Sequence, residues 1–271
     1  MKFWLVFTLA VFLKSLSSYG QEMMWEPIFT LREKEISLVD IDNDGKILIA
    51  DQRGNLDQYN QSGDAINHYS PEFQGTLSQV EAGRTLNIFT FSYDLQKFEI
   101  LNRFISPLFS GRLNNLEFGN IRAASLGNNQ KIWLYDETNF SLIQYDYRRN
   151  EVLQQQSLNL IFEDSNFTII ELTEYQNTLF MNVKDKGIFL FDNQANYIGK
   201  LNLITKQKLS FSGNCIFSTS KNQLIQTDYL SGKEKRFNFP TPNMKVSVHR
   251  DLFIFYNSHS LQAYKGEIVK K

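Results

Sequence analysis

The chain is 271 residues long and has an ordinary globular composition, with 42% hydrophobic and 21% charged residues, which excludes the class of highly charged disordered chains. Its 28 Lys and Arg residues nearly balance 29 Asp and Glu residues, for a formal net charge of -1, so no overall positive field attracts nucleic acid. A single domain of this length is usual for an all-β fold.

The first 20 residues have the three-part pattern of a secretory signal peptide. Lys2 precedes an apolar run over residues 3–13, and the small residues Ser18 and Gly20 follow at the positions that a signal peptidase reads. The apolar run is shorter than the roughly 20 residues that a membrane-spanning helix needs. We therefore expect residues 1–20 to be removed and residues 21–271 to be exported; an uncleaved membrane anchor is the alternative.

A two-part motif recurs along the mature chain at intervals of about 35–50 residues, the range of propeller blades. Its first part is a compact apolar run, found at residues 47–50, 86–89, 132–135, 179–181, 215–217 and 252–255. Its second part follows about a dozen residues later as Leu or Ile, two further residues and an aromatic one, at 56–59, 95–98, 142–145, 188–191 and 261–264. The fifth copy, from Leu224 to Thr227, keeps the spacing without the aromatic residue.

This repeat predicts a six-bladed β-propeller over residues 21–271. Middle strands of a blade are covered on both faces by neighbouring blades and tolerate continuous apolar runs, whereas outer strands meet solvent and alternate. Hairpin signals such as Asn43-Asp44-Gly45 and Gln61-Ser62-Gly63-Asp64 stand between the runs. A two-sheet sandwich or an open meander is the alternative, but neither explains a constant register inside six copies.

The N-terminal segment Pro27–Leu31 precedes the first copy and has no partner there, while the last copy ends without a full fourth strand. We expect this segment to complete the last blade by pairing beside residues 262–264 or 267–269, because such a closure hides two sheet edges at once.

The first copy also resembles a known repeat. Residues 40–51 join an Asp-x-Asp-Gly turn to an apolar strand that ends in Ala50-Asp51, and Leu56 to Tyr59 follow with Gly63. This pattern resembles the repeat of NHL-type and related six-bladed propellers, best in residues 40–63, and implies that architecture. The chain is also similar in outline to calcium-dependent sugar lactonases, which would imply acidic and amide ligands around the central channel. Neither resemblance assigns a function.

One segment has the spacing of an oxygen-rich calcium loop. Asp40, Asp42 and Asp44 alternate before Gly45, and Asp51 stands at the twelfth position where such loops have Glu. Calcium is thus the one cofactor that the sequence suggests. The alternative is a hairpin turn between two strands, for which Asn-Asp-Gly is a favoured sequence.

A second candidate site lies in the segment 103–113, away from the repeat. It combines Arg103, Phe104, Phe109 and Arg112, and Arg and Phe are enriched at protein interfaces. These four residues are predicted to bind a partner; a long connection between blades is the alternative.

No catalytic motif such as Gly-x-Ser-x-Gly is present. We therefore expect a monomeric, non-enzymatic interaction module in the bacterial envelope, periplasmic or extracellular, that binds a protein or peptide and not nucleic acid. The alternative is a calcium-dependent hydrolase, lactonase or lyase with its site at the channel mouth. Three or more Asp, Glu, Asn or His side chains converging there would favour the enzyme, and an apolar channel would favour the module.

Overall fold

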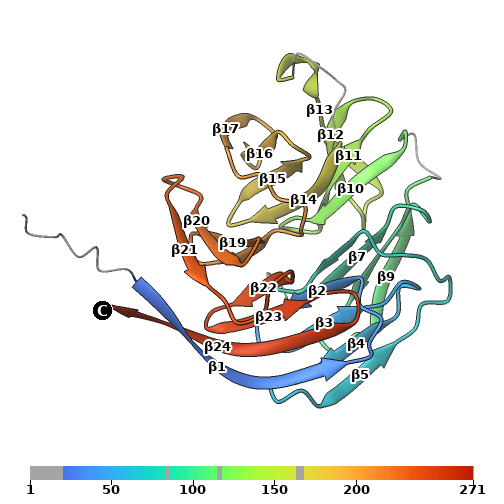
Figure 1. The fold of residues 1–271 in the computed structure, drawn as a ribbon. Coiled ribbons are helices and arrows are strands. Elements are labelled where there is room, and N and C mark those ends of the chain that lie inside the picture. The colour runs from blue at the N-terminus through green and yellow to red at the C-terminus, as the bar shows by residue number, and fades with distance from the viewer. Residues whose placement is uncertain (1–20, 84–85, 115–117, 163–167, 271) are drawn as a thin grey trace, which may run out of the picture.

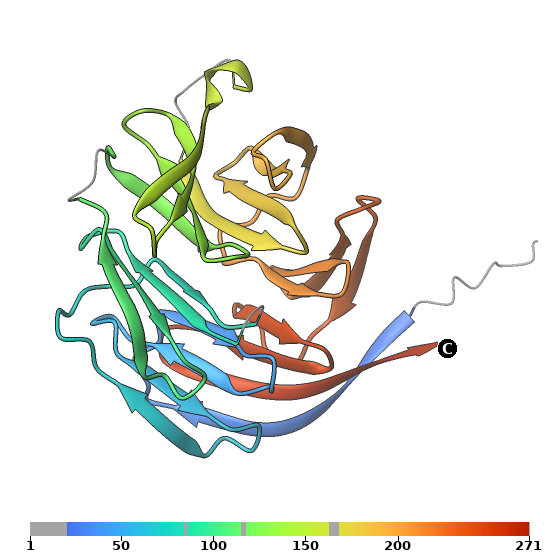
Figure 2. The same cartoon turned by 180° about the vertical axis from the view of Figure 1, so that it is seen from behind.

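The computed structural model describes residues 21–83, 86–114, 118–162 and 168–270, and the predicted signal peptide lies outside them. These residues form six four-stranded antiparallel sheets arranged around a common axis (Figures 1 and 2). The prediction of a six-bladed β-propeller is confirmed. One short 3₁₀ turn, Leu158–Leu160, interrupts the strands. Over the part of the chain that is described, no helix has the length and hydrophobicity needed to cross a membrane.

Each blade is named here in chain order, with its strands given from the axis outward. Blade 1 has β2 (Leu38–Ile41), β3 (Ile47–Ala50), β4 (Leu56–Tyr59) and β5 (Ala65–Tyr69). Blade 2 has β6 (Gln79–Glu81), β7 (Ile88–Ser92), β8 (Lys97–Leu101) and β9 (Pro107–Arg112). Blade 3 has β10 (Ile121–Leu126), β11 (Lys131–Asp136), β12 (Ser141–Asp146) and β13 (Glu151–Ser157).

The remaining three blades follow the same order. Blade 4 has β14 (Ile169–Tyr175), β15 (Thr178–Val183), β16 (Gly187–Phe191) and β17 (Tyr197–Leu201). Blade 5 has β18 (Ser210–Ser212), β19 (Cys215–Ser220), β20 (Gln223–Asp228) and β21 (Glu234–Asn238). Blade 6 has β22 (Lys245–His249), β23 (Leu252–Tyr256), β24 (Ser260–Lys270) and, outermost, β1 (Gln21–Arg32).

The middle strands are buried and the outer strands alternate, as the repeat predicts. Every residue of β7, β8 and β12 is buried, whereas β9 and β5 alternate between exposed and half-buried positions. Six apolar clusters occur among the described residues, and each one joins two neighbouring blades around the ring. A single blade therefore cannot hide its own apolar faces, and the core of this protein consists of the contacts between blades.

The first strand closes the last blade, as predicted. β1 pairs antiparallel with β24, with Pro27 opposite Tyr264 and Thr30 opposite Gln262, and Figure 1 shows the two long strands side by side. Of the two predicted partners, residues 262–264 lie opposite Pro27–Leu31, whereas residues 267–269 pair with residues 22–24, which precede that segment.

Trp25 of β1 fastens this closure to the neighbouring blade. Its ring makes edge contacts with Phe253 and Phe255, with centroids 5.0 and 5.4 Å away. Its indole Nε1 donates to the backbone oxygen of Asn238 in blade 5, at 2.9 Å. Gly266 lies opposite Trp25, and a Cβ there would come within 3.0 Å of the indole and 2.7 Å of Phe253. The close approach of these rings therefore requires glycine at position 266.

The up-and-down order of the strands gives the ring two unlike faces. Turns between the first and second strands and between the third and fourth strands lie on one side, which we call the turn face. Turns between the second and third strands and the connections from blade to blade lie on the other, the crossover face.

Candidate functional site

The innermost strands are linked around the axis by side chains that accept hydrogen bonds from the next blade. Four of these hydrogen bonds share one geometry. In each, a side-chain oxygen on the inner strand of one blade accepts a hydrogen bond from a backbone N–H at the inner strand of the next blade. They are Asp40 Oδ2 with Ala82 at 2.7 Å, Glu81 Oε2 with Leu126 at 3.0 Å, Ser125 Oγ with Glu174 at 2.9 Å, and Ser210 Oγ with Val248 at 2.7 Å. These polar groups hold the ring together.

Glu171 supplies the equivalent link from blade 4 to blade 5. Its Oε2 accepts the backbone N–H of Leu209 at 2.7 Å, and its Oε1 accepts from Thr173 Oγ1 at 2.7 Å and from Gln79 Nε2 of blade 2 at 3.3 Å. Burial raises the pKa of this carboxyl to about 7, although the charge of Lys208 and the three hydrogen bonds oppose the rise. Glu171 thus joins three blades and titrates near neutral pH.

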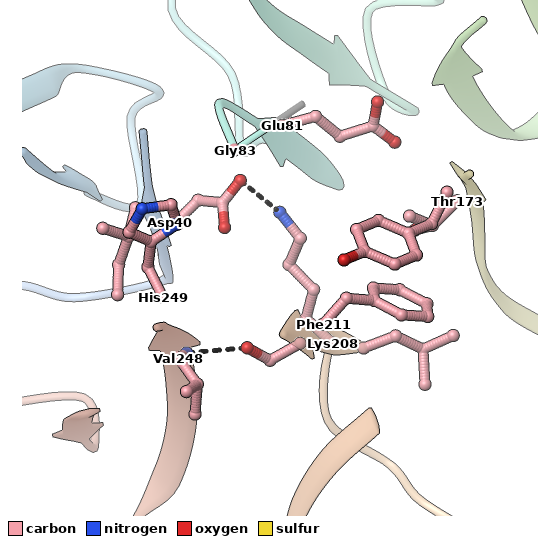
Figure 3. A pocket seen from close by; sticks show the side chains of 12 residues that line it. Asp40, Glu81, Gly83, Thr173, Lys208, Phe211, Val248 and His249 are labelled. Carbon is pink, nitrogen blue, oxygen red and sulfur yellow. Dashed lines mark hydrogen bonds and ion pairs between the residues drawn. The ribbon is translucent and has the colours of Figure 1, made fainter. Parts of the chain in front are cut away.

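A small cavity opens at the turn-face mouth of the channel. Its volume is about 60 Å³, and blades 1, 2, 4, 5 and 6 contribute to its lining. Figure 3 shows Lys208 pointing toward Asp40, with Nζ 3.5 Å from Oδ2, and Glu81 and His249 nearby. Pockets for small-molecule ligands usually have volumes of about 300–1,000 Å³. This cavity is large enough for water or for one side chain of a partner.

The same cavity contains buried polar atoms whose hydrogen-bonding capacity is not satisfied by the part of the protein that the structure describes. Lys208 Nζ and His249 Nε2 are both buried without a hydrogen-bond partner within the described residues. Burial lowers the pKa of His249, and the charge of Arg250 acts in the same direction. Asp40, Glu81 and His249 lie around one cavity, but in the described ranges no three His, Cys, Asp or Glu residues form a group that could hold a metal ion.

The four aspartates of the predicted calcium loop have separate partners. Asp42 Oδ1 accepts the backbone N–H groups of Asp44 and Lys46 at 2.9 and 2.8 Å, and burial raises its pKa. Asp51 Oδ1 similarly closes the next turn, while Asp40 faces the channel. The segment has the hairpin geometry that the sequence left as the alternative. Calcium binding by these residues stays a prediction.

The four predicted partner-binding residues lie at two different places. Arg103 and Phe104 form the turn between β8 and β9 on the turn face, whereas Arg112 ends β9 on the crossover face. Phe109 lies between them on β9 and is half-buried, with its ring centroid 5.8 Å from Phe98 and 4.9 Å from Tyr147. The structure thus gives Phe109 a packing role and divides the arginines between the two faces.

On the turn face, Phe104 is flanked by two cations. Its side chain is 53% exposed, with the Arg103 guanidinium 4.9 Å and Lys46 Nζ 5.8 Å from the ring centroid. Leu86, 80% exposed, and Arg103 line a shallow cleft between blades 1 and 2, and Asp42 and Ala82 continue it toward the channel mouth. Lys46 and Leu86 were missed in the sequence, because Lys46 follows a turn of the repeat and Leu86 was counted in the apolar run 86–89. The strand of that run, β7, begins only at Ile88, which leaves Leu86 outside it.

An equivalent arrangement exists on the crossover face. Phe73 is 49% exposed, and the Arg112 guanidinium and Lys97 Nζ lie 4.9 and 5.7 Å from its ring centroid. Lys97 is itself paired with Glu99 Oε1 at 2.7 Å. The distance between these two aromatic clusters is the length of blade 2, so one small partner cannot contact both.

Comparisons with known proteins identify the fold and no family. No family model and no curated protein sequence matches the chain. The WD40 domain of Neurospora crassa Pan2 is similar in structure, with a TM-score of 0.58 over 91% of this chain and 96% of that one. A catalytically inactive virginiamycin B lyase from Staphylococcus aureus with quinupristin has a TM-score of 0.59 over 90% and 99%.

The β-propeller domain of Myceliophthora thermophila Cps50 (Swd1) also has a TM-score of 0.59, over 91% of this chain and 99% of that one. All three are 12% identical to this chain. At that identity the likeness establishes a β-propeller and says nothing about ligand or partner. The more specific resemblance to NHL-type propellers stays a prediction.

Proposed function

We propose that this protein is an exported, non-enzymatic β-propeller that binds a protein or peptide partner in the bacterial envelope. Its binding surface is the turn-face cleft between blades 1 and 2. The ring of six blades provides a rigid frame, and the turns on its faces carry the contact residues. Export rests on the signal-peptide pattern of residues 1–20.

One observation carries the proposal: Phe104 stays half exposed between Arg103 and Lys46. Aromatic and Arg side chains are enriched among the residues that contribute most to binding at interfaces. Because the ring already packs against the two cations, less side-chain entropy is lost when a partner covers it. Leu86 adds apolar area beside it.

The channel mouth is lined by Asp40, Glu81 and His249 and not by apolar residues alone, so the case for a binding module depends on how the polar side chains of the channel are used. Glu81, Ser125 and Glu171 accept hydrogen bonds from the backbone of the next blade. A hydrolytic site would instead direct several polar groups toward one substrate atom. Glu81, Ser125 and Glu171 are instead used to join neighbouring blades, so the exposed turns are the better candidates for function.

Site-specific photo-crosslinking tests this proposal. A photoreactive phenylalanine analogue at position 104 is expected to give a discrete crosslinked species in the native envelope, and the added Arg103→Ala change is expected to weaken that species at least fivefold. The same analogue at Phe73, on the crossover face, and at Ile198, on outer strand β17, serves as the matched control. An equal yield at Phe73, or no species at position 104, would contradict the proposed surface.

A further inference from the structure

A second cleft lies on the turn face, between blades 3 and 4. Its volume is about 530 Å³, and it opens broadly to solvent. Its walls are formed by Asn129 and Arg149 from the two turns of blade 3 and by Asn193 and Gln194 from the β16–β17 turn of blade 4. It is much larger than the cleft of about 20 Å³ between blades 1 and 2.

The floor of this cleft is fixed by hydrogen bonds between the two blades. Gln144 Nε2 donates to the backbone oxygen of Asn193 at 2.6 Å, and Gln154 Nε2 donates to that of Gln194. Gln58 makes the corresponding bond to Arg103 between blades 1 and 2, at 3.1 Å. These hydrogen bonds between blades 3 and 4 fix the distance between the two sides of the cleft when no ligand is bound. A site that is already ordered has a smaller entropic cost of binding.

The described residues that line this cleft include many side-chain amides and no aromatic side chain. Five of the nine lining residues are Asn or Gln, and each amide offers both donors and acceptors. A ligand with many hydroxyl groups, which also donate and accept, matches such a lining. Leu153, 38% exposed, adds a patch of apolar surface that suits the C–H face of a sugar ring.

The charges in the cleft give it a net positive sign. Lys131 and Arg149 are the cations, and Asp146 is the one carboxylate among the lining residues. Asp146 already accepts the backbone N–H groups of residues 148 and 149, and its Oδ2 lies 3.7 Å from Arg149 Nε. The Arg149 side chain is 75% exposed, so its remaining N–H groups are open to a ligand.

We propose that this cleft binds an oligosaccharide that carries carboxylate groups, such as a short uronic-acid chain. The amides contact the hydroxyls, and Arg149 with Lys131 pairs with one carboxylate, which suits the planar fork of a guanidinium. A polyphosphate is a poorer match, because phosphate-rich ligands are bound by several cations at once. The site is distinct from the Phe104 surface, so the two proposals succeed or fail independently.

Titration calorimetry of the mature chain tests this site, with a galacturonate hexamer, maltohexaose and inorganic polyphosphate as probes. Saturable binding of the hexuronate is expected, weakened at least tenfold by Arg149→Ala and by Gln194→Ala, while maltohexaose binds at least tenfold more weakly. Arg236→Ala, at an exposed position on outer strand β21 of blade 5, is the matched control and leaves binding unchanged. Thermal unfolding of each variant confirms that it is folded.

Three results would overturn the inference. One is the absence of binding to the hexuronate. Another is hexuronate binding that Arg149→Ala and Gln194→Ala leave unchanged. The third is equal or tighter binding of maltohexaose or polyphosphate, which would show that carboxylated sugars are not the class of ligand that this cleft recognises.

Discussion

Deletion of residues 21–31 is expected to abolish the cooperative thermal unfolding transition of the mature chain. The deletion removes the outer strand of blade 6, including Trp25 and its contacts with Phe253, Phe255 and blade 5. It also uncovers the apolar cluster between blades 6 and 1, against which Phe29 and Leu31 pack. Each large apolar side chain contributes about 1.5–3 kcal/mol on burial, and a whole domain is stable by only about 5–15 kcal/mol.

Calorimetry or circular dichroism measures this effect directly. The matched control ends the chain after Gly266, which removes the tip of β24 but keeps the pairs from Trp25–Gly266 to Arg32–Ser260. That control should retain a cooperative transition, shifted by no more than a few degrees. An unfolding temperature for the 21–31 deletion equal to that of the full mature chain would refute the closure.

Replacing Glu171 with Gln is expected to remove a large pH dependence of stability. Burial raises the pKa of this carboxyl from 4.5 to about 7 in the folded protein. Between those two pH values the folded state keeps a proton that the unfolded state releases, so the free energy of unfolding falls as pH rises. At about 1.4 kcal/mol per pKa unit, the fall reaches about 3 kcal/mol and levels off above pH 7.

Denaturant unfolding of both proteins from pH 4.5 to 8 measures this difference. His249, whose pKa is lowered by burial, makes the stability rise with pH toward neutrality, so the comparison uses the variant minus the wild type at each pH. The control is Glu267→Gln, at an exposed carboxyl, which should follow the wild-type profile within about 0.5 kcal/mol. A Glu171→Gln profile parallel to that of the wild type would contradict a buried, proton-holding carboxyl.

The blade count and the ring closure could be predicted from the sequence, because both depend on local patterns. The runs at 132–135 and 252–255 are apolar throughout, since their strands are covered on both faces. The unpartnered segment Pro27–Leu31 pointed to the one blade that lacked a strand. The fifth copy keeps the spacing of the motif, and Thr227, which stands where the other copies have an aromatic residue, is buried.

The channel network could not be predicted, because it depends on contacts between distant segments. Gln79 and Glu171 are 92 residues apart in the chain and meet only when the ring closes. Both lie on innermost strands, which precede the recurring motif and share little sequence. The sequence therefore gave no sign that these polar residues converge.

The division of the predicted partner site has a similar cause. Residues 107–112 contain Pro107 and Gly111, which favour a loop, yet they form outer strand β9. An edge strand tolerates proline, since one side of its backbone needs no partner. Because strand β9 runs from the turn that holds Arg103 to Arg112 at its end, the two arginines that the sequence placed in one segment lie on opposite faces of the ring.

The central claim is that the first strand closes the ring by pairing with the last, and a cysteine pair tests its register. Glu26 and Lys265 are directly opposed and exposed, and opposed Cβ atoms of paired strands lie about 4.5–5.5 Å apart. With Cys215, the one native cysteine, replaced by Ser, oxidation should link Glu26→Cys to Lys265→Cys rapidly. The pair Glu26→Cys and Glu267→Cys, displaced by two residues, should not form a bond. Equal yields from both pairs, or no bond in the first, would contradict the closed six-bladed ring.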